Sequence, residues 1–165
     1  MKFKSEAELK KFLLAKCKEA VARTEQKVHS IIDMCLEQFY NEFSPIEYIR
    51  TEQLLHSLVR SGIEPNGKNG YKARVYFDAD ALDYKKGAVE IRSTGLTGRM
   101  GYAVWDTDTI LDVAMTGSYS GLPHGGYQEG TAIWSQSQKG MQALGGVYEM
   151  LERELKAIGV PIVKK

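Results

Sequence analysis

Apolar residues in the first forty positions recur every three or four residues, as they do along one face of an amphipathic helix. The segment contains neither Gly nor Pro, and Ser5 with Glu8 forms a capping-box pattern at its start. Ser44 and Pro45 end it, because proline disfavours helical geometry in the residue before it. The pattern therefore predicts one long helix over residues 1–43. Its apolar face carries Leu9, Phe12, Leu13, Cys17, Ala20, Val21, Val28, Ile31, Ile32, Cys35, Leu36, Phe39 and Tyr40.

This helix is long for the size of the chain. About 38 helical residues span roughly 57 Å, whereas a compact chain of 165 residues is about 40 Å across. The helix therefore either breaks near residues 23–27, where the apolar face thins, and folds back on its own domain, or projects from the body. A projecting apolar face needs a partner to cover it. We expect self-association through the far end of the helix, at Leu9, Phe12 and Leu13, and we expect Arg23 and Glu25 on the solvent side.

Residues 44–165 have a different composition, since all sixteen glycines follow residue 61. Thr51 is positioned to cap a short helix that directs Leu54 and Leu58 inward. Alternating polar and apolar residues over 71–77 are typical of a half-buried strand. Further strands are predicted at 88–92 and 102–105, and a final helix carries the apolar residues from Met141 to Ile158 and ends at Gly159.

The sequence thus predicts a single α+β domain over residues 1–165. It consists of a long N-terminal helix over 1–43 and an α+β body over 44–165. The helix projects from the body unless it breaks and folds back. The body contains a small antiparallel sheet of three or four strands and a C-terminal helix. The alternation over residues 71–77 and the turn-rich connections favour antiparallel pairing over a parallel sheet with crossover helices.

Composition narrows the range of partners. The chain has 22 Lys+Arg against 21 Asp+Glu, so it lacks the basic character of a protein that binds nucleic acid or a membrane surface. No apolar run approaches the roughly 20 residues that span a bilayer. Charges interrupt residues 1–20 every few positions, which argues against a signal peptide. We expect neither a membrane partner nor sequence-specific binding of nucleic acid.

The two cysteines, Cys17 and Cys35, are 18 residues apart in the predicted long helix. That separation corresponds to about 27 Å, which is beyond the reach of a disulfide within the helix. Both fall on the apolar face, so we expect them to be reduced, small, buried hydrophobic residues. Reduced thiols suit the cytoplasm.

Candidate catalytic chemistry is sparse. His29, His56 and His124 are scattered, and no Cys/His grouping has the spacing of a zinc site. His124, in a glycine-flanked segment, is the best candidate for a general base. His124 together with Asp106 or Asp108 could serve a small metal- or phosphate-dependent hydrolase, which is one alternative class of protein. A small regulatory binding module is a further alternative. The sequence favours a protein without enzymatic activity, metal or cofactor.

One stretch of the sequence resembles a known family. The long helix is followed by Tyr48-x-Arg50-Thr51-x-x-Leu54-x-x-Ser57. This looks like the opening of the tail-component family of long-tailed bacteriophages, whose members commonly read Tyr-x-Arg-Thr-Gly-x-Leu. Here Glu52 stands where the glycine is usual. The later sequence is similar in order and type, at His124-Gly125-Gly126, Glu129-Gly130-Thr131, Trp134 and the closing helix.

The resemblance implies a structural protein of the virion with no active-site residues. Members are neck or tail-completion proteins, which form part of a ring between the head connector and the tail. The resemblance therefore implies a homo-oligomeric ring, contacts with other connector and tail proteins, and assembly into the virion in the bacterial cytoplasm. Tyr48, Arg50 and Thr51 would set the angle between the long helix and the sheet, and His124 would make a loop or interface contact.

Overall fold

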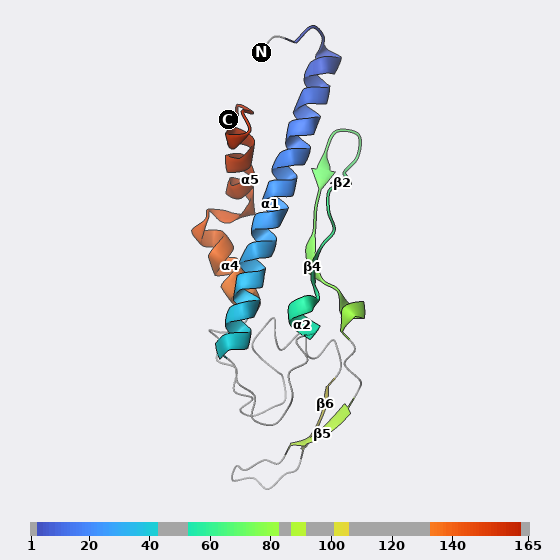
Figure 1. Ribbon diagram of the computed structural model, residues 1–165, viewed down its shortest axis with the longest axis vertical. Coiled ribbons are helices and arrows are strands. Elements are labelled where there is room, and N and C mark those ends of the chain that lie inside the picture. The colour runs from blue at the N-terminus through green and yellow to red at the C-terminus, as the bar shows by residue number, and fades with distance from the viewer. Residues whose placement is uncertain (1–2, 43–52, 83–86, 92–100, 106–132, 163–165) are drawn as a thin grey trace.

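The computed structural model describes residues 3–42, 53–82, 87–91, 101–105 and 133–162. Within these residues the protein is α+β, with a long N-terminal helix, short antiparallel strands and helices near the C-terminus, as the sequence predicts. Figure 1 shows helix α1 (Glu6–Glu42) running along the long axis of the molecule. Helices α4 (Ile133–Ala143) and α5 (Gly146–Ala157) lie on one side of it, and strands β2 (Glu64–Pro65) and β4 (Val75–Phe77) lie on the other.

Helix α1 extends without a break over Glu6–Glu42. Its 37 residues give a length of about 55 Å, so the break considered near residues 23–27 does not occur. The predicted cap at its start is present: the Ser5 hydroxyl accepts a hydrogen bond from the Glu8 amide at 3.2 Å. The Glu8 carboxylate accepts in return from the Lys4 amide at 2.8 Å, one residue before the usual capping-box position.

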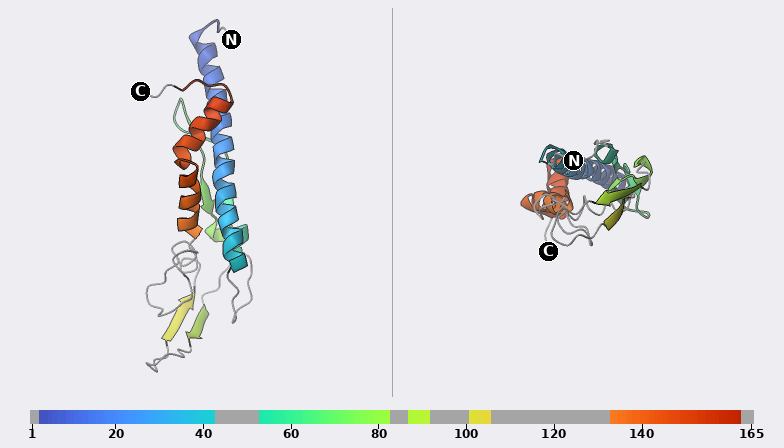
Figure 2. Two further views of the ribbon diagram at one scale, coloured as in Figure 1. Left: turned by 90° about the vertical axis from the view of Figure 1, so that its left-hand side faces the viewer. Right: turned by 90° about the horizontal axis from the view of Figure 1, so that it is seen from below.

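Burial changes along α1. Residues 6–19 include no buried side chain, and Ala20 is the first residue of the helix to be fully covered. Beyond it, Thr24, Ile32, Leu36 and Phe39 are buried as well. Figure 2 shows that the first turns of α1 extend past the end of α5. The helix is therefore packed against its own chain over its second part and projects over its first.

Two pairs of short strands form one irregular antiparallel hairpin beside α1. Leu58 pairs with Phe77, whereas Glu64 pairs with Lys72, so the first strand contains one extra residue between the two pairs. Gly62 lies at this bulge with φ +71°, a backbone angle that glycine adopts without strain. The strands are β1 (Leu58–Arg60), β2 (Glu64–Pro65), β3 (Tyr71–Lys72) and β4 (Val75–Phe77).

The strands differ in detail from the prediction. The strand expected over 71–77 is divided into β3 and β4, and β1 and β2 had no predicted counterpart. Helix α2 (Gln53–His56) ends before Leu58, which belongs to β1 instead of the short helix. The described strands form two-stranded pairs, including β5 (Gly87–Ile91) with β6 (Gly101–Trp105), in place of a sheet of three or four strands. Alternation of polar and apolar residues indicates which face of a strand is buried, but it does not specify the strand with which it pairs.

The predicted C-terminal helix is two helices, α4 (Ile133–Ala143) and α5 (Gly146–Ala157). The apolar spacing continues through the break, but Gly145 and Gly146, at the junction, adopt φ +83° and +84°, which interrupts a continuous α-helix. The predicted stop at Gly159 is confirmed. The amides of Gly159 and Val160 donate to the carbonyls of Lys156 and Leu155, which is the Schellman arrangement at a helix end.

The apolar core lies against the C-terminal part of α1. It joins the long helix to α2, β1 and α4, and a short 3₁₀ helix, η1 (Ala79–Ala81), leads into it after a cap by Asp78. Gly140 allows α4 to approach α1 closely, since a Cβ at this position would lie 3.0 Å from the Ile31 side chain. The buried members are Ile32, Leu36, Phe39, Leu54, Leu58, Leu82 and Ile133.

The two cysteines are free, as expected, but each is half-buried and not fully covered. Cys35 packs against the edge of the core. Cys17 lies in the part of α1 that precedes Ala20, where no side chain is fully buried. The prediction of buried cysteines is therefore only partly correct, because the apolar face of α1 extends beyond the elements that cover it.

Candidate functional site

The predicted contact residues of the long helix lie at its projecting end. Leu9 and Leu13 are exposed, with 37% and 36% of their surface accessible. Phe12 is half-buried: its ring packs against that of Phe3 at 5.2 Å between centroids, and the Lys16 ammonium lies 6.0 Å from its centre. Two of the three predicted residues are therefore open to contact. The other predicted site residues, Tyr48, Arg50, Thr51, Asp106, Asp108 and His124, lie outside the described residues.

The middle of α1 is fastened to the hairpin by a buried carboxylate. Glu25 is only 8% exposed, and its Oε1 accepts a hydrogen bond from the Gly62 amide at 3.0 Å. Beside this contact, the Ser61 hydroxyl accepts from the Arg74 amide at 2.9 Å and donates to the Gly62 carbonyl at 2.8 Å. The bulge of the hairpin is thus held by side chains, and Glu25 connects it to α1.

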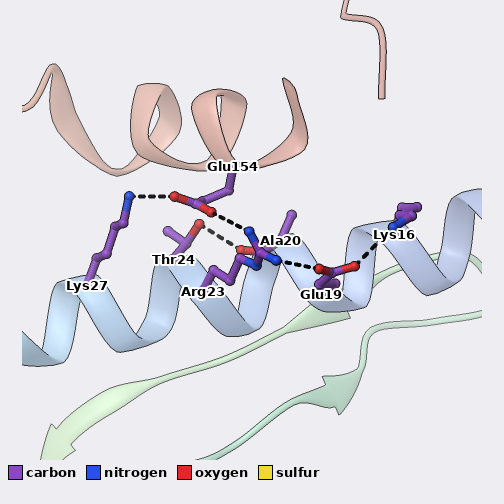
Figure 3. Close-up of polar contacts among 7 residues, drawn as sticks. All are labelled: Lys16, Glu19, Ala20, Arg23, Thr24, Lys27 and Glu154. Carbon is purple, nitrogen blue, oxygen red and sulfur yellow. Dashed lines mark hydrogen bonds and ion pairs between the residues drawn. The ribbon is translucent and has the colours of Figure 1, made fainter. Parts of the chain in front are cut away.

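The opposite side of α1 is joined to α5 by ion pairs. Glu154 of α5 lies between Lys27, whose Nζ is 2.5 Å from its carboxylate, and Arg23, at 3.7 Å. Arg23 also contacts Glu19 at 2.7 Å, and Glu19 contacts Lys16 at 3.2 Å. Figure 3 shows this chain of alternating charges, together with the hydrogen bond from the Thr24 hydroxyl to the Ala20 carbonyl. The contact between α1 and α5 therefore contains charged groups where a helix pair usually has apolar ones.

A groove of about 560 Å³ lies between α1 and the α4–α5 pair. Its rim is rich in positive charge, since Arg23 and Lys27 of α1 face Arg153 of α5 across it. Each of these cations has a carboxylate partner, because Glu19 and Glu154 contact the first two and Glu149 lies 3.9 Å from Arg153. The groove therefore offers little unpaired positive charge that could attract an anion.

Two surface carboxylates have altered pKa values. The hydrogen bond from Lys16 holds the pKa of Glu19 below its ordinary value of 4.5, and the charge of Arg23 acts in the same direction. On the hairpin, the hydrogen bond from Arg74, followed by that from Lys72, lowers the pKa of Glu64. Both shifts result from neighbouring cations, which marks structural ion pairs and not an acid or base prepared for catalysis.

A smaller apolar groove of about 270 Å³ lies between the hairpin and α4. Trp134 and Tyr76 stand at its rim with about half of their surface exposed, and Ile32 and Ile133 of the core lie below them. In the part of the chain that the structure describes, no group of three or more His, Cys, Asp or Glu could hold a metal ion.

Sequence reasoning missed the two buried carboxylates that connect α1 to its neighbours. Glu25 is expected on the solvent side of the helix and is instead buried, while Arg23 is exposed as expected. The thinning of the apolar face near residues 23–27 was the available signal. It indicates polar packing on both sides of the helix and not a break. None of the described helices is long and apolar enough to cross a membrane.

Comparison with known proteins identifies the family of this α+β chain. A family model named YomN, after a gene of a Bacillus phage or prophage, matches residues 5–157, which indicates a phage-associated protein. The chain therefore belongs to the YomN family. No curated protein and no solved structure matches it.

Proposed function

We propose that this protein is a structural component of a phage virion, acting at the neck or in tail completion by assembly and not by catalysis. Membership of a phage-associated family over residues 5–157 carries the proposal. The motif Tyr48-x-Arg50-Thr51 and the order of elements resemble those of tail-component proteins. In this role the protein forms a homo-oligomeric ring and contacts other connector and tail proteins.

The use of charged groups in the described residues supports a structural role. Glu25 and Glu154 are buried carboxylates with partners on other elements, and they hold the hairpin and α5 to the long helix. Apolar side chains are exposed at Leu9 and Leu13, where a partner would cover them. A molecule that acts by assembly needs a stiff body and open contact surfaces, and about 55 Å of helix with a projecting end provides both.

The experiment that tests this proposal is deletion of the gene from the phage or prophage that carries it. Loss of a neck or tail-completion protein leaves filled heads and separate tails, which electron microscopy of the lysate distinguishes from joined particles. A copy of the gene supplied in trans should restore joined particles, and mass spectrometry should detect the protein in them. Joined, infectious particles from the deletion strain would refute the neck role.

A further inference from the structure

Strand β4 has an open edge on the side away from β1. The Asp78 amide donates to the Ser57 carbonyl, and hydrogen-bonded positions alternate along an antiparallel strand. Tyr76 therefore also bonds to β1, whereas the amides and carbonyls of Val75 and Phe77 point away from it. Within the described residues, β1 is the only strand that pairs with β4. The outward groups of β4 are thus available to a further strand.

We propose that this edge pairs with β4 of a second copy, antiparallel and about a two-fold axis at Tyr76. In this register Val75 of each copy faces Phe77 of the other, and the two residues exchange the amide and carbonyl groups that point outward. Each strand supplies the donors and acceptors that the other strand needs. The two hairpins then form one continuous antiparallel sheet with the two β4 strands at its centre.

The side chains on the outer face of β4 are self-complementary in the same register. Val75 and Phe77 pack against the core, so Arg74, Tyr76 and Asp78 lie on the opposite face, where Arg74 and Tyr76 are exposed. The axis at Tyr76 places Arg74 of each copy opposite Asp78 of the other. Cross-strand pairs of opposite charge and of aromatic rings both stabilise a sheet, and this one strand provides both.

The two charged groups can make the new contact and keep those they already have. Arg74 contacts Glu64 through Nη2, and Asp78 accepts a hydrogen bond from the Asp80 amide through Oδ1. Nη1 of Arg74 and Oδ2 of Asp78 remain for the second copy. Because one strand carries both the positive and the negative partner, charge complementarity favours a second copy of this chain as the occupant of the edge.

The features that protect a sheet edge lie on the other strand of the hairpin. That strand contains the bulge at Gly62, Pro65 and the charged Arg60, all of which discourage pairing with a further strand, and Leu58 is buried. By contrast, Val75–Phe77 consists of residue types favoured in strands, each at least partly exposed. The apolar groove of about 270 Å³ borders all three residues and leaves this edge uncovered.

The proposed contact is closed, since a two-fold pair uses the same strand of both copies and adds no third. The inference therefore goes beyond the proposed neck role and does not rest on it: a ring requires a further contact. The gene deletion reports on that role separately, because a dimer can form in a protein that no particle contains. The paired strands are short, and their contact is small beside the roughly 800 Å² per partner of a standard interface. The dimer should depend on protein concentration.

Cysteine cross-linking tests the register. The two Tyr76 residues face each other at a position without hydrogen bonds, where the Cα atoms of antiparallel strands are about 4.5 Å apart. That separation is within the range of roughly 4.4–6.8 Å that a disulfide spans. Under mild oxidation, Tyr76→Cys should give a covalent dimer of twice the 18.5 kDa chain on a non-reducing gel.

Tyr148→Cys is the matched control, since Tyr148 is 72% exposed and lies on α5. This variant should stay a single chain on the same gel, as should the wild type with its free Cys17 and Cys35. Absence of a covalent dimer for Tyr76→Cys, or equal cross-linking of the control, overturns the proposal.

Charge exchange tests the pairing of Arg74 with Asp78. Arg74→Glu and Asp78→Arg each place like charges opposite each other, so light scattering at high concentration should give single chains for either variant and dimers for the wild type. An equal mixture of the folded variants should form dimers, because each pair between different variants then joins opposite charges.

Thermal unfolding of each variant shows whether it is folded. The cross-link does not depend on replacing Asp78, so it decides the proposal even if loss of the η1 cap unfolds Asp78→Arg. A wild-type protein that stays a single chain at every concentration, an Arg74→Glu variant that associates like the wild type, or a mixture of folded variants without dimers overturns the proposal.

Discussion

The two ends of helix α1 have different surroundings although the same apolar spacing runs through both. From Ile32 to Phe39 the helix contacts α2, β1 and α4, and its inward side chains are less than one-tenth exposed. At Leu9 and Leu13 the same spacing faces solvent, with more than a third of each side chain accessible. The core of the domain therefore explains the apolar face at one end and not at the other.

Between these ends, α1 is held by polar contacts. Glu25 binds the hairpin bulge on one side, and Arg23 with Lys27 binds Glu154 on the other. Polar contacts require specific geometry, so they fix the orientation of α5 and the hairpin along the helix axis more strictly than apolar packing does. The helix therefore combines a core end that provides stability, a middle that sets orientation and an open end.

The largest expected effect distinguishes the two ends of α1 directly. Leu36→Ala should lower the free energy of unfolding by about 2–5 kcal/mol, because Leu36 is fully buried and its loss leaves a cavity. Leu9→Ala, the same change on the exposed end, should alter it by less than about 0.5 kcal/mol. Urea unfolding of dilute protein, followed by circular dichroism, measures both. Equal losses for the two variants would show that the open end also supports the fold.

The next effect concerns the middle of the helix. Glu25→Ala should cost about 1–3 kcal/mol, since it leaves the Gly62 amide without its carboxylate acceptor. Glu25→Gln keeps a carbonyl oxygen in the same place and should cost less, which makes it the matched control. Hydrogen exchange should locate the loss, with faster exchange at the Gly62 amide than in the wild type. Identical behaviour of the two variants would mean that the hydrogen bond contributes little.

A smaller effect is expected on the α5 side. Glu154→Gln removes the charge that pairs with Lys27 and Arg23, and both cations are about half exposed, so water can solvate them once the charge is lost. A loss of about 1 kcal/mol is therefore expected, near the upper end for exposed ion pairs. Glu149→Gln provides the control, because its pair with Arg153 is long, at 3.9 Å. A larger loss of stability for Glu149→Gln than for Glu154→Gln would show that other contacts hold α5 to the long helix.

The sequence predicted the elements that depend on local periodicity. The apolar spacing predicted a long helix where α1 lies, the Ser5 cap marked its start, and Gly159 marked the end of α5. The glycine pair at 145–146 was missed because apolar residues continue at helical spacing across it. Leu58 was placed in a helix because a short apolar segment fits either a helix or a strand.

Contacts between distant segments were harder to predict than the elements themselves. The hydrogen bond between Glu25 and Gly62 joins residues 37 positions apart, and that between Lys27 and Glu154 joins residues 127 positions apart. Neither pair has a sequence signature, since a glutamate on a helix is ordinarily solvated. The candidate contact surface at Leu9 and Leu13 was predicted because the long helix exceeds the width of a compact chain of this size. Both lengths can be estimated from the sequence alone.

The smallest expected effect is a pH dependence of the polar middle of α1. Lys16 and Arg23 lower the pKa of Glu19 relative to its ordinary value of 4.5. A carboxylate with a lower pKa in the folded state contributes stability above its unfolded pKa, and this contribution is lost as the pH falls through the folded value. Glu19→Gln should therefore be less stable than the wild type at pH 7, and the difference should shrink as the pH falls below 4.5. Because the side chain is accessible to solvent, added salt should reduce the difference at pH 7. A difference that persists unchanged at pH 3 would show that Glu19 acts through packing and not through its charge.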